Sequence, residues 1–306
     1  MDSMIRSTRR QFLKTSATFL ATAAIANQFD FKKEKLRLSF STLGCPDWTF
    51  EKIADFAAAN NYTGLEIRGI QRQMDLTKCK EFSAENMQAT LRLMKDKGLR
   101  FVDLGSSAEM HHGDPEERQK QLEEAKRFIE LAEQVKCPYV RVFPNKLSKE
   151  DRAATIDIII KGLKDAGNFA NGTSVMVLME THGDVVESAV IKQIMDAVNH
   201  PKVGLVWDVS NMWTVTKEPP AQVYSTLKNY IYHTHIKDAK LADNGPQYKL
   251  MGKGDVPIFE AIDLLHKDGY KGYYSFEWEK LWHPDIDEPE VALADYPKAM
   301  MRHFNK

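Results

Sequence analysis

The chain has 306 residues, of which 43% are hydrophobic and 28% charged, a composition typical of a globular protein with a large buried core. The net charge is -1, so the composition indicates neither nucleic acid nor an anionic membrane as a partner. The three cysteines are widely spaced, which argues against a disulfide framework or a zinc ribbon.

The first 26 residues have the composition of an export signal. Arg9 and Arg10 precede a short apolar run that ends in Ala-Ile-Ala and is too short to span a membrane. Paired arginines followed by Phe-Leu-Lys are similar to the twin-arginine signal, whose cargo crosses the membrane already folded. No cysteine stands at the cleavage site, so no lipid anchor is expected, and a basic amphipathic helix is the alternative interpretation. We therefore predict a signal peptide over residues 1–26, cleavage near Ala26, a periplasmic location and a catalytic domain over residues 27–306.

Beyond this segment, eight short apolar runs alternate with longer segments of helical periodicity. Pro220, Pro257 and Pro289 stand where helices should begin, because proline is tolerated in the first turn of a helix. Nearly continuous apolar strands separated by helices indicate a parallel sheet covered by helices, and the count of eight favours a single (β/α)8 TIM barrel over an open doubly wound sheet. The predicted strands are residues 36–41, 64–67, 100–104, 139–143, 175–180, 203–208, 231–236 and 273–277.

The last four predicted strands carry residues that commonly bind metals. Glu180 and Asp208 end the fifth and sixth strands, His235 lies on the seventh, and Glu277 ends the eighth. The carboxyl ends of barrel strands meet at one face, so these four side chains should converge there. A carboxylate at the end of a buried strand is costly unless it is paired or coordinated. Three carboxylates and one imidazole predict one divalent ion, with manganese first and magnesium, cobalt or zinc as alternatives.

This set of motifs resembles the xylose-isomerase-like superfamily of sugar isomerases and epimerases, and within it the ketose 3-epimerase and inosose dehydratase branch. The resemblance covers essentially the whole mature chain and includes the His-x-His pair of the seventh strand and the Gly-rich loop at residues 251–255. It implies that His235 binds the metal and that Glu180 and Glu277 both bind the metal and exchange protons. Ketose epimerases usually carry histidine where this chain has Asn211, which argues against an ordinary ketose as substrate.

The ligand set and the resemblance together predict a metal-dependent sugar isomerase or epimerase. A divalent cation that chelates a carbonyl and its neighbouring hydroxyl stabilises the enediolate formed when the adjacent C–H loses its proton. One carboxylate would take that proton and the facing carboxylate would return one. Loss of a β-substituent would instead give a lyase or dehydratase acting on a keto-sugar, keto-glycoside or inosose. A non-catalytic exported sugar-binding barrel and an apurinic-site endonuclease are further alternatives, and the endonuclease would need a trinuclear zinc cluster and a basic face.

Other residues at the same end of the barrel are candidates for binding the substrate. His182 and Lys237 continue inward-facing strand positions, although a surface position for Lys237 is an equal alternative, and His233 is expected to pack or to orient its neighbour. Tryptophans that follow strands, Trp48, Trp213 and Trp278, could face a sugar ring. His111 and His112 are adjacent on a loop, so their side chains are expected to point apart. The substrate-binding candidates are Glu66 or Arg68, Arg141, His182, Asn211, Trp213 and Lys237.

The expected partner is a small sugar or keto-sugar, with no nucleic acid and no stable membrane anchor. An exported enzyme meets free sugars and glycosides more readily than sugar phosphates, so phosphorylated substrates are disfavoured. The sequence leaves the oligomeric state open, and a homo-oligomer is compatible with it.

Overall fold

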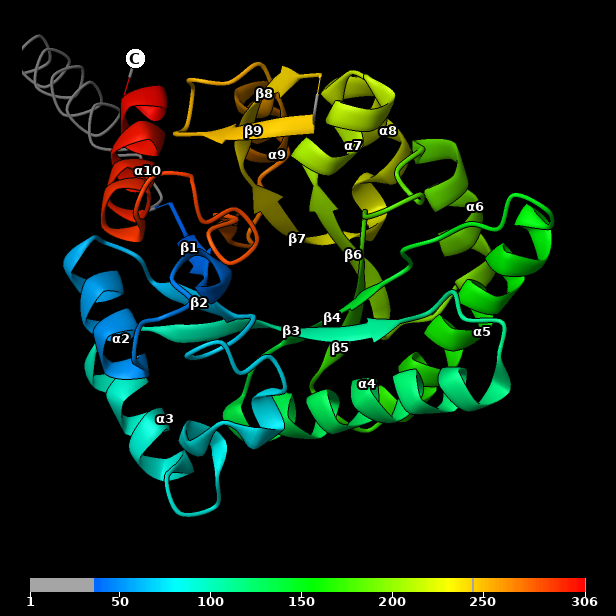
Figure 1. Cartoon of the computed structure of the whole chain (residues 1–306), viewed down its shortest axis with the longest axis horizontal. Helices are drawn as coiled ribbons and strands as arrows, with labels where there is room; N and C mark the ends of the chain where they lie inside the picture. Colours follow the sequence, from blue (N-terminus) through cyan, green and yellow to red (C-terminus); the bar gives the residue numbers. More distant parts are fainter. Residues whose placement is uncertain (1–35, 244, 306) are drawn as a thin grey trace, which may run out of the picture. The chain divides into compact units, whose positions relative to one another are not determined.

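Eight parallel strands close into a barrel in the computed structural model, which describes residues 36–243 and 245–305 (Figure 1). Each predicted strand is present, so the predicted single (β/α)8 barrel is confirmed. The predicted export signal and the boundary after Ala26 lie outside the described residues. The barrel strands are β1 (Leu38–Ser41), β2 (Gly64–Ile67), β3 (Arg100–Glu109), β4 (Tyr139–Phe143), β5 (Met176–Glu180), β6 (Val203–Asp208), β7 (Ile231–Ile236) and β10 (Tyr274–Phe276).

Helices follow the strands and form the outer layer of the barrel (Figure 1). Pro220 and Pro289 are the first residues of their helices, and Pro257 immediately precedes the first residue of another, as the sequence predicts. Among the residues that the structure describes, no helix combines the length and the apolar character needed to cross a membrane. The helices are α2 (Phe50–Ala59), α3 (Met87–Asp96), α4 (Pro115–Val135), α5 (Arg152–Ala170), α6 (Ser188–Val198), α7 (Val209–Thr216), α8 (Pro220–Leu227), α9 (Ile258–Lys267) and α10 (Pro289–Phe304).

Aromatic packing closes the barrel between its first and last strands. β10 pairs with both β1 and β7, and the ring of Phe276 on β10 stacks on Tyr296 of α10 with centroids 4.5 Å apart. Trp278 follows β10, is fully buried and donates its indole N–H to the carbonyl of Asp287. Trp48 is also buried and packs against Phe56. Two of the three tryptophans considered as sugar platforms are therefore part of the protein core.

A β-hairpin that the sequence does not predict lies between β7 and α9. Its antiparallel strands are β8 (Asp238–Ala242) and β9 (Gly245–Lys249). The Gly-rich loop that follows the hairpin supports it, because Oδ2 of Asp238 accepts hydrogen bonds from the backbone N–H groups of Gly252 and Gly254, each at 2.9 Å. A Cβ atom at Gly254 would lie 2.1 Å from Oδ1 of Asp238, so only glycine allows this approach.

Candidate metal centre

The four predicted metal ligands meet at the mouth of the barrel. Glu180 ends β5, Asp208 ends β6, His235 lies on β7 and Glu277 directly follows β10. These four strands are consecutive neighbours in the barrel wall, so the barrel closure itself brings the side chains together. Each residue offers one ligand atom, and these atoms all lie within 4.8 Å of one another. All four side chains are buried.

The imidazole of His235 stands at the centre of this group. Its Nδ1 lies 3.2 Å from Oε1 of Glu277, 3.5 Å from Oε1 of Glu180 and 4.0 Å from Oδ2 of Asp208. Burial lowers the pKa of His235, but the surrounding carboxylates, Glu277 first, outweigh it and raise that pKa well above its ordinary value. The ring is therefore protonated when no metal is bound, and metal binding would displace the Nδ1 proton.

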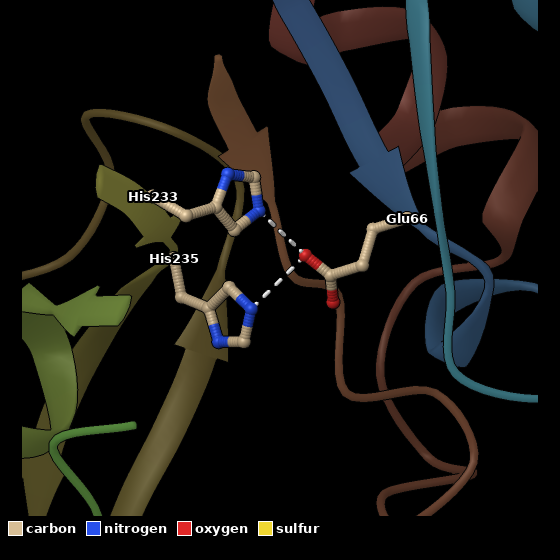
Figure 2. Close-up of side chains that lie close together, drawn as sticks. All are labelled: Glu66, His233 and His235. Carbon is tan, nitrogen blue, oxygen red and sulfur yellow. Dashed lines mark hydrogen bonds and ion pairs between the residues drawn. The ribbon is translucent and has the colours of Figure 1, made fainter. Parts of the chain in front are cut away.

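Glu66 of β2 lies beside this histidine and orients it (Figure 2). A single oxygen, Oε2, lies 3.0 Å from Nε2 of His235 and 3.0 Å from Nε2 of His233, and it also accepts a hydrogen bond from Ser275 Oγ at 3.1 Å. Nε2 of His235 is thus held against a carboxylate, which turns Nδ1 toward Glu180, Asp208 and Glu277. A carboxylate behind a ligating histidine commonly fixes both its tautomer and its ring orientation in metal sites.

Nδ1 of His235, Oδ2 of Asp208 and Oε2 of Glu180 are buried and make no hydrogen bond of good geometry, although each lies within ion-pair distance of an opposite charge. Buried polar atoms normally find partners, because an unsatisfied one costs about 1–3 kcal/mol. Oxygen donors grouped with one imidazole nitrogen, all within 4.8 Å of one another, fit a divalent cation. The donor set and its close grouping therefore make these four residues a candidate site for one metal ion.

Lys237 is buried in the same cluster and not on the surface, which was one of its two expected positions. Its Nζ lies 2.5 Å from Oε2 of Glu277 and 2.7 Å from Oε1 of Glu279. Burial lowers the pKa of Lys237, but the neighbouring carboxylates raise it well above its ordinary value. The lysine is therefore charged and neutralises part of the acidic cluster.

Glu279 is not among the site residues predicted from the sequence. Its spacing of two from Glu277 places both on one face of an extended segment.

The two glutamates of the cluster are ionised. Burial raises the pKa of Glu180, but the positive charges of His235 and Arg141 outweigh it and hold the pKa below the ordinary value. Burial is similarly outweighed at Glu277, where His235 and Lys237 hold the pKa well below the ordinary value. Burial raises the pKa of Asp208 to about 7. Glu180 and Glu277 are thus in the form that both a metal ligand and a proton acceptor require.

A cavity of about 230 Å³ opens beside the cluster. This is smaller than the roughly 300–1,000 Å³ of pockets for drug-sized ligands, and it suits a molecule of the size of one small sugar. Basic side chains and acidic side chains face this cavity, together with three apolar side chains. The lining residues are Leu43, Arg68, Arg141, Phe143, Glu180, His182, Lys237, Glu277, Glu279 and Trp282.

Residues 54–301 match the sequence profile of the family described as xylose isomerase-like TIM barrel. The chain belongs to this family. No curated protein sequence is significantly similar to it.

Solved structures share the fold of this xylose isomerase-like barrel at low sequence identity. The probable 3-DHS dehydratase AsbF of Bacillus anthracis is 18% identical, with a TM-score of 0.70 over 87% of this chain and 99% of that one. A D-tagatose 3-epimerase-like protein is 16% identical, with a TM-score of 0.70 over 88% of this chain and 97% of that one. The IOLI protein, solved with a bound zinc atom, is 17% identical, with a TM-score of 0.70 over 88% of this chain and 98% of that one.

Three of the predicted substrate-binding residues of this xylose isomerase-like barrel line the cavity beside Glu180. Arg141 is buried, with Nε 3.2 Å from Oε2 of Glu180 and its guanidinium 3.7 Å from the ring centroid of Phe143. His182 faces the cavity and its Nδ1 pairs with Oδ1 of Asn145 at 2.8 Å. Lys237 is the third. Arg68, the alternative to Glu66, also lines the cavity and donates to the Ser107 hydroxyl at 3.0 Å.

The other three predicted substrate contacts lie outside the cavity lining. Glu66 has no exposed surface, and its carboxylate pairs with the two histidines of β7. Asn211 contacts two ligand residues, since its backbone N–H donates to Oδ1 of Asp208 at 2.8 Å and its Nδ2 donates to Oε1 of Glu180 at 3.4 Å. Trp213 lies on α7 with the ammonium of Lys217 4.0 Å from its ring centroid.

Trp282 is the aromatic residue that does face the cavity. It follows β10 in a segment without regular secondary structure and is 58% exposed. Sequence reasoning considered the tryptophans close to strand ends and missed this one. The sequence held no signal for this residue, because the conformation of a loop decides which tryptophan reaches the cavity.

Proposed function

We propose that the chain is a divalent-metal-dependent sugar isomerase or epimerase. One carboxylate removes a proton from the substrate, and a second carboxylate returns one. The observation that carries this proposal is the placement of Glu180 and Glu277. They come from β5 and β10, flank His235 Nδ1 at 3.5 and 3.2 Å, and both line the cavity. Two carboxylates from different strand ends, facing one small cavity, are suited to proton exchange, since the ionised form removes a proton and the protonated form returns one.

The metal would be held by Glu180, Asp208, His235 and Glu277, with manganese preferred and magnesium, cobalt or zinc as alternatives. When bound, it would supply Lewis-acid stabilisation of the negative charge that develops on the substrate oxygens. The relative solved with zinc shows that a similar barrel holds a divalent ion.

The chain's own residues would divide the proton transfer between them. One glutamate, in its ionised form, accepts the proton of a C–H next to the substrate carbonyl. The other glutamate, once it has taken up a proton from solvent, donates that proton to the opposite face of the same carbon, which gives the epimer. The first glutamate then releases its proton to solvent. Arg141 lies beside Glu180 and Lys237 beside Glu277, so each carboxylate has its own cation that favours its ionised form. Arg68 and His182 face the cavity and would bind sugar oxygens.

A lyase or dehydratase acting on a keto-sugar, keto-glycoside or inosose is the second candidate function. Asn211 favours it, because its side-chain amide donates to Glu180 where ketose epimerases usually carry a histidine. The same proton removal would then be followed by departure of a hydroxyl or glycosidic oxygen from the neighbouring carbon, with a proton supplied to the leaving oxygen. The complete donor set argues against a sugar-binding protein without catalysis.

Deuterium exchange tests the proposal and separates its two outcomes. The manganese-loaded protein is incubated with a panel of keto-sugars and keto-glycosides in heavy water, and products are followed by NMR and mass spectrometry. Epimerisation yields a labelled epimer of unchanged formula apart from the label, whereas elimination yields an unsaturated product and a released water or alcohol.

The glutamate variants test the carboxylate roles. Glu180→Gln and Glu277→Gln should each lower turnover by roughly 10²–10⁴-fold, because a positioned proton-transfer group contributes that much. Metal should still bind, since three ligands remain. Glu81→Gln, which changes another buried glutamate outside the cavity lining, serves as the control and should keep parental turnover. Near-parental turnover in both active-site variants would require the two-carboxylate mechanism to be abandoned.

A further inference from the structure

A second group of metal-binding residue types lies on the loop that follows β3. This strand runs further than predicted, to Glu109, and His111 and His112 follow before α4 begins at Pro115. Nε2 of His112 lies 2.9 Å from Oε2 of Glu109, and Nδ1 of His111 lies 3.7 Å from the same oxygen. The two adjacent histidines do not point apart as expected, because their ring centroids are 4.2 Å apart and both rings face one carboxylate.

His111 supplies an observation that points to a ligand. Its Nδ1 is buried and has no hydrogen-bond partner, and its side chain is only 12% exposed. Burial and then the neighbouring His112 lower the pKa of His111 below its ordinary value. The charges of Glu109 and Asp184 oppose this lowering of the pKa, and that of Lys146 adds to it.

The carboxylate of Glu109 is held in position by its surroundings. Oε1 accepts a hydrogen bond from Nδ2 of Asn145 at 2.6 Å, which leaves Oε2 for the two histidines. Gln121 of α4 accepts from the backbone N–H of Glu109 at 2.9 Å. Asn145 in turn pairs through Oδ1 with Nδ1 of His182, a residue of the cavity lining. Two hydrogen bonds therefore connect Glu109 to the proposed sugar pocket.

The distances between the donor atoms of Glu109, His111 and His112 are close to those around a tetrahedrally coordinated ion. Zinc binds imidazole nitrogens and carboxylate oxygens at about 2.0–2.2 Å, so its donor atoms lie about 3.3–3.6 Å apart. The 3.7 Å between His111 and Glu109 is close to this, and the 2.9 Å hydrogen bond of His112 would have to open by about half an ångström. The side chain of His112 is 27% exposed on a loop, which gives it room to move.

We propose that Glu109, His111 and His112 form a second metal site, for zinc or a cation of similar preference. Two imidazoles and one carboxylate favour zinc, whereas the three carboxylates and one imidazole of the first site favour manganese or magnesium. A fourth position remains for water. The ion would join the end of β3 to the loop that precedes α4 and, through Asn145, hold His182 at the pocket. The proposal does not depend on the reaction that the first site performs.

Zinc titration of the full chain tests the second site. The protein is stripped with a chelator, titrated with zinc alone, and analysed for bound metal by elemental analysis and for affinity by calorimetry. The parent should hold about two zinc ions per chain, and the double variants His111→Ala/His112→Ala and Asp208→Ala/His235→Ala should each hold about one. His266→Ala, which removes an exposed histidine of α9, is the matched control and should hold about two.

A milder variant keeps the test decisive if a double variant does not fold. Glu109→Gln has almost the same shape and should weaken zinc binding at the second site about tenfold or more, with the first site unchanged. Cobalt in place of zinc should give the visible absorption of a four-coordinate ion that Glu109→Gln reduces and Asp208→Ala does not. The proposal is overturned if the variants of Glu109, His111 and His112 bind zinc as tightly and in the same amount as the parent. Loss of all zinc from the Asp208 and His235 variant would overturn it equally.

Discussion

Nζ of Lys237 lies 2.7 Å from Oδ2 of Asp208, so one of the four proposed metal ligands also holds a cation of the chain itself. The same ammonium contacts Glu277 and Glu279. Together with protonated His235, it balances much of the negative charge of the cluster when no metal is present. The barrel mouth can therefore fold before the metal is bound.

Lys237→Met should destabilise the metal-free protein by about 3–5 kcal/mol, because it leaves buried carboxylates without their partner. Manganese should recover more of this loss in the variant than it adds to the parent, since the metal supplies positive charge at the same place. Urea denaturation with and without manganese measures both effects. Lys240→Met, a change at an exposed position of β8, should have little effect on either curve. Equal stabilities of the Lys237 variant and the parent would contradict the role assigned to this ion pair.

Glu66→Gln should lower manganese affinity about 10–100-fold, because it removes the charge that orients His235 from behind. Ser275→Ala removes only one hydrogen bond to the same carboxylate oxygen and should have a smaller effect. Calorimetric titration of the chelator-treated proteins gives the two affinities. If both variants bind manganese as the parent does, the orientation of His235 does not depend on Glu66.

Asp103 should make stability depend on pH between about 4 and 8. It is fully buried, neither of its carboxyl oxygens has a hydrogen-bond partner, and burial followed by the charge of Glu66 raises its pKa to about 8. The pKa in the unfolded chain is about 3.9, so the folded state binds the proton more tightly. The stabilisation that this proton provides is complete below pH of about 4 and is lost as pH rises through about 8.

Asp103→Asn cannot ionise and should therefore gain stability relative to the parent as pH rises across this window. Free energies of unfolding measured at several pH values between 4 and 9 would show the two curves diverging. Parallel curves would mean that Asp103 has the same pKa in the folded and unfolded chains.

We propose that the chain is exported in folded form and cleaved near Ala26, on the pattern of Arg9 and Arg10 before the short apolar run. Replacing both arginines with lysine should leave uncleaved precursor in the cytoplasm, whereas replacing Lys14 with arginine should not. Cell fractionation with detection of the precursor and mature forms makes the comparison. Normal export of the double-lysine variant would rule out a twin-arginine route.

The barrel could be predicted from the sequence because its strands are buried on both faces and read as apolar runs. The β8–β9 hairpin could not, since strand Gly245–Lys249 contains a proline, is partly exposed and lacks apolar alternation. Its formation depends on the contact of Asp238 with Gly252 and Gly254, which is a tertiary relationship.

The site likewise contains residues that the strand pattern predicts and residues that depend on loop conformation. The convergence of Glu180, Asp208, His235 and Glu277 follows from parallel topology, so the strand ends were sufficient to predict it. Side chains on loops were not predictable in this way. Trp282 reaches the cavity, and His111 and His112 face one carboxylate, because of backbone conformations that a single sequence does not encode in a periodic pattern.

The proposed metal ligands all come from one arc of the barrel wall, β5, β6, β7 and β10, which are consecutive in the strand order. The facing arc, β1 to β4, contributes or directly precedes the segments that carry Leu43, Arg68, Arg141 and Phe143 in the cavity. The loops after β1 and β2 therefore carry cavity residues but no metal ligand, whereas His182, Glu279 and Trp282 line the cavity from the coordinating arc. Substitutions and insertions after β1 and β2 could retune the choice of substrate across a lineage while the coordinating half stays fixed, and an engineer could graft those loops between barrels without rebuilding the metal centre.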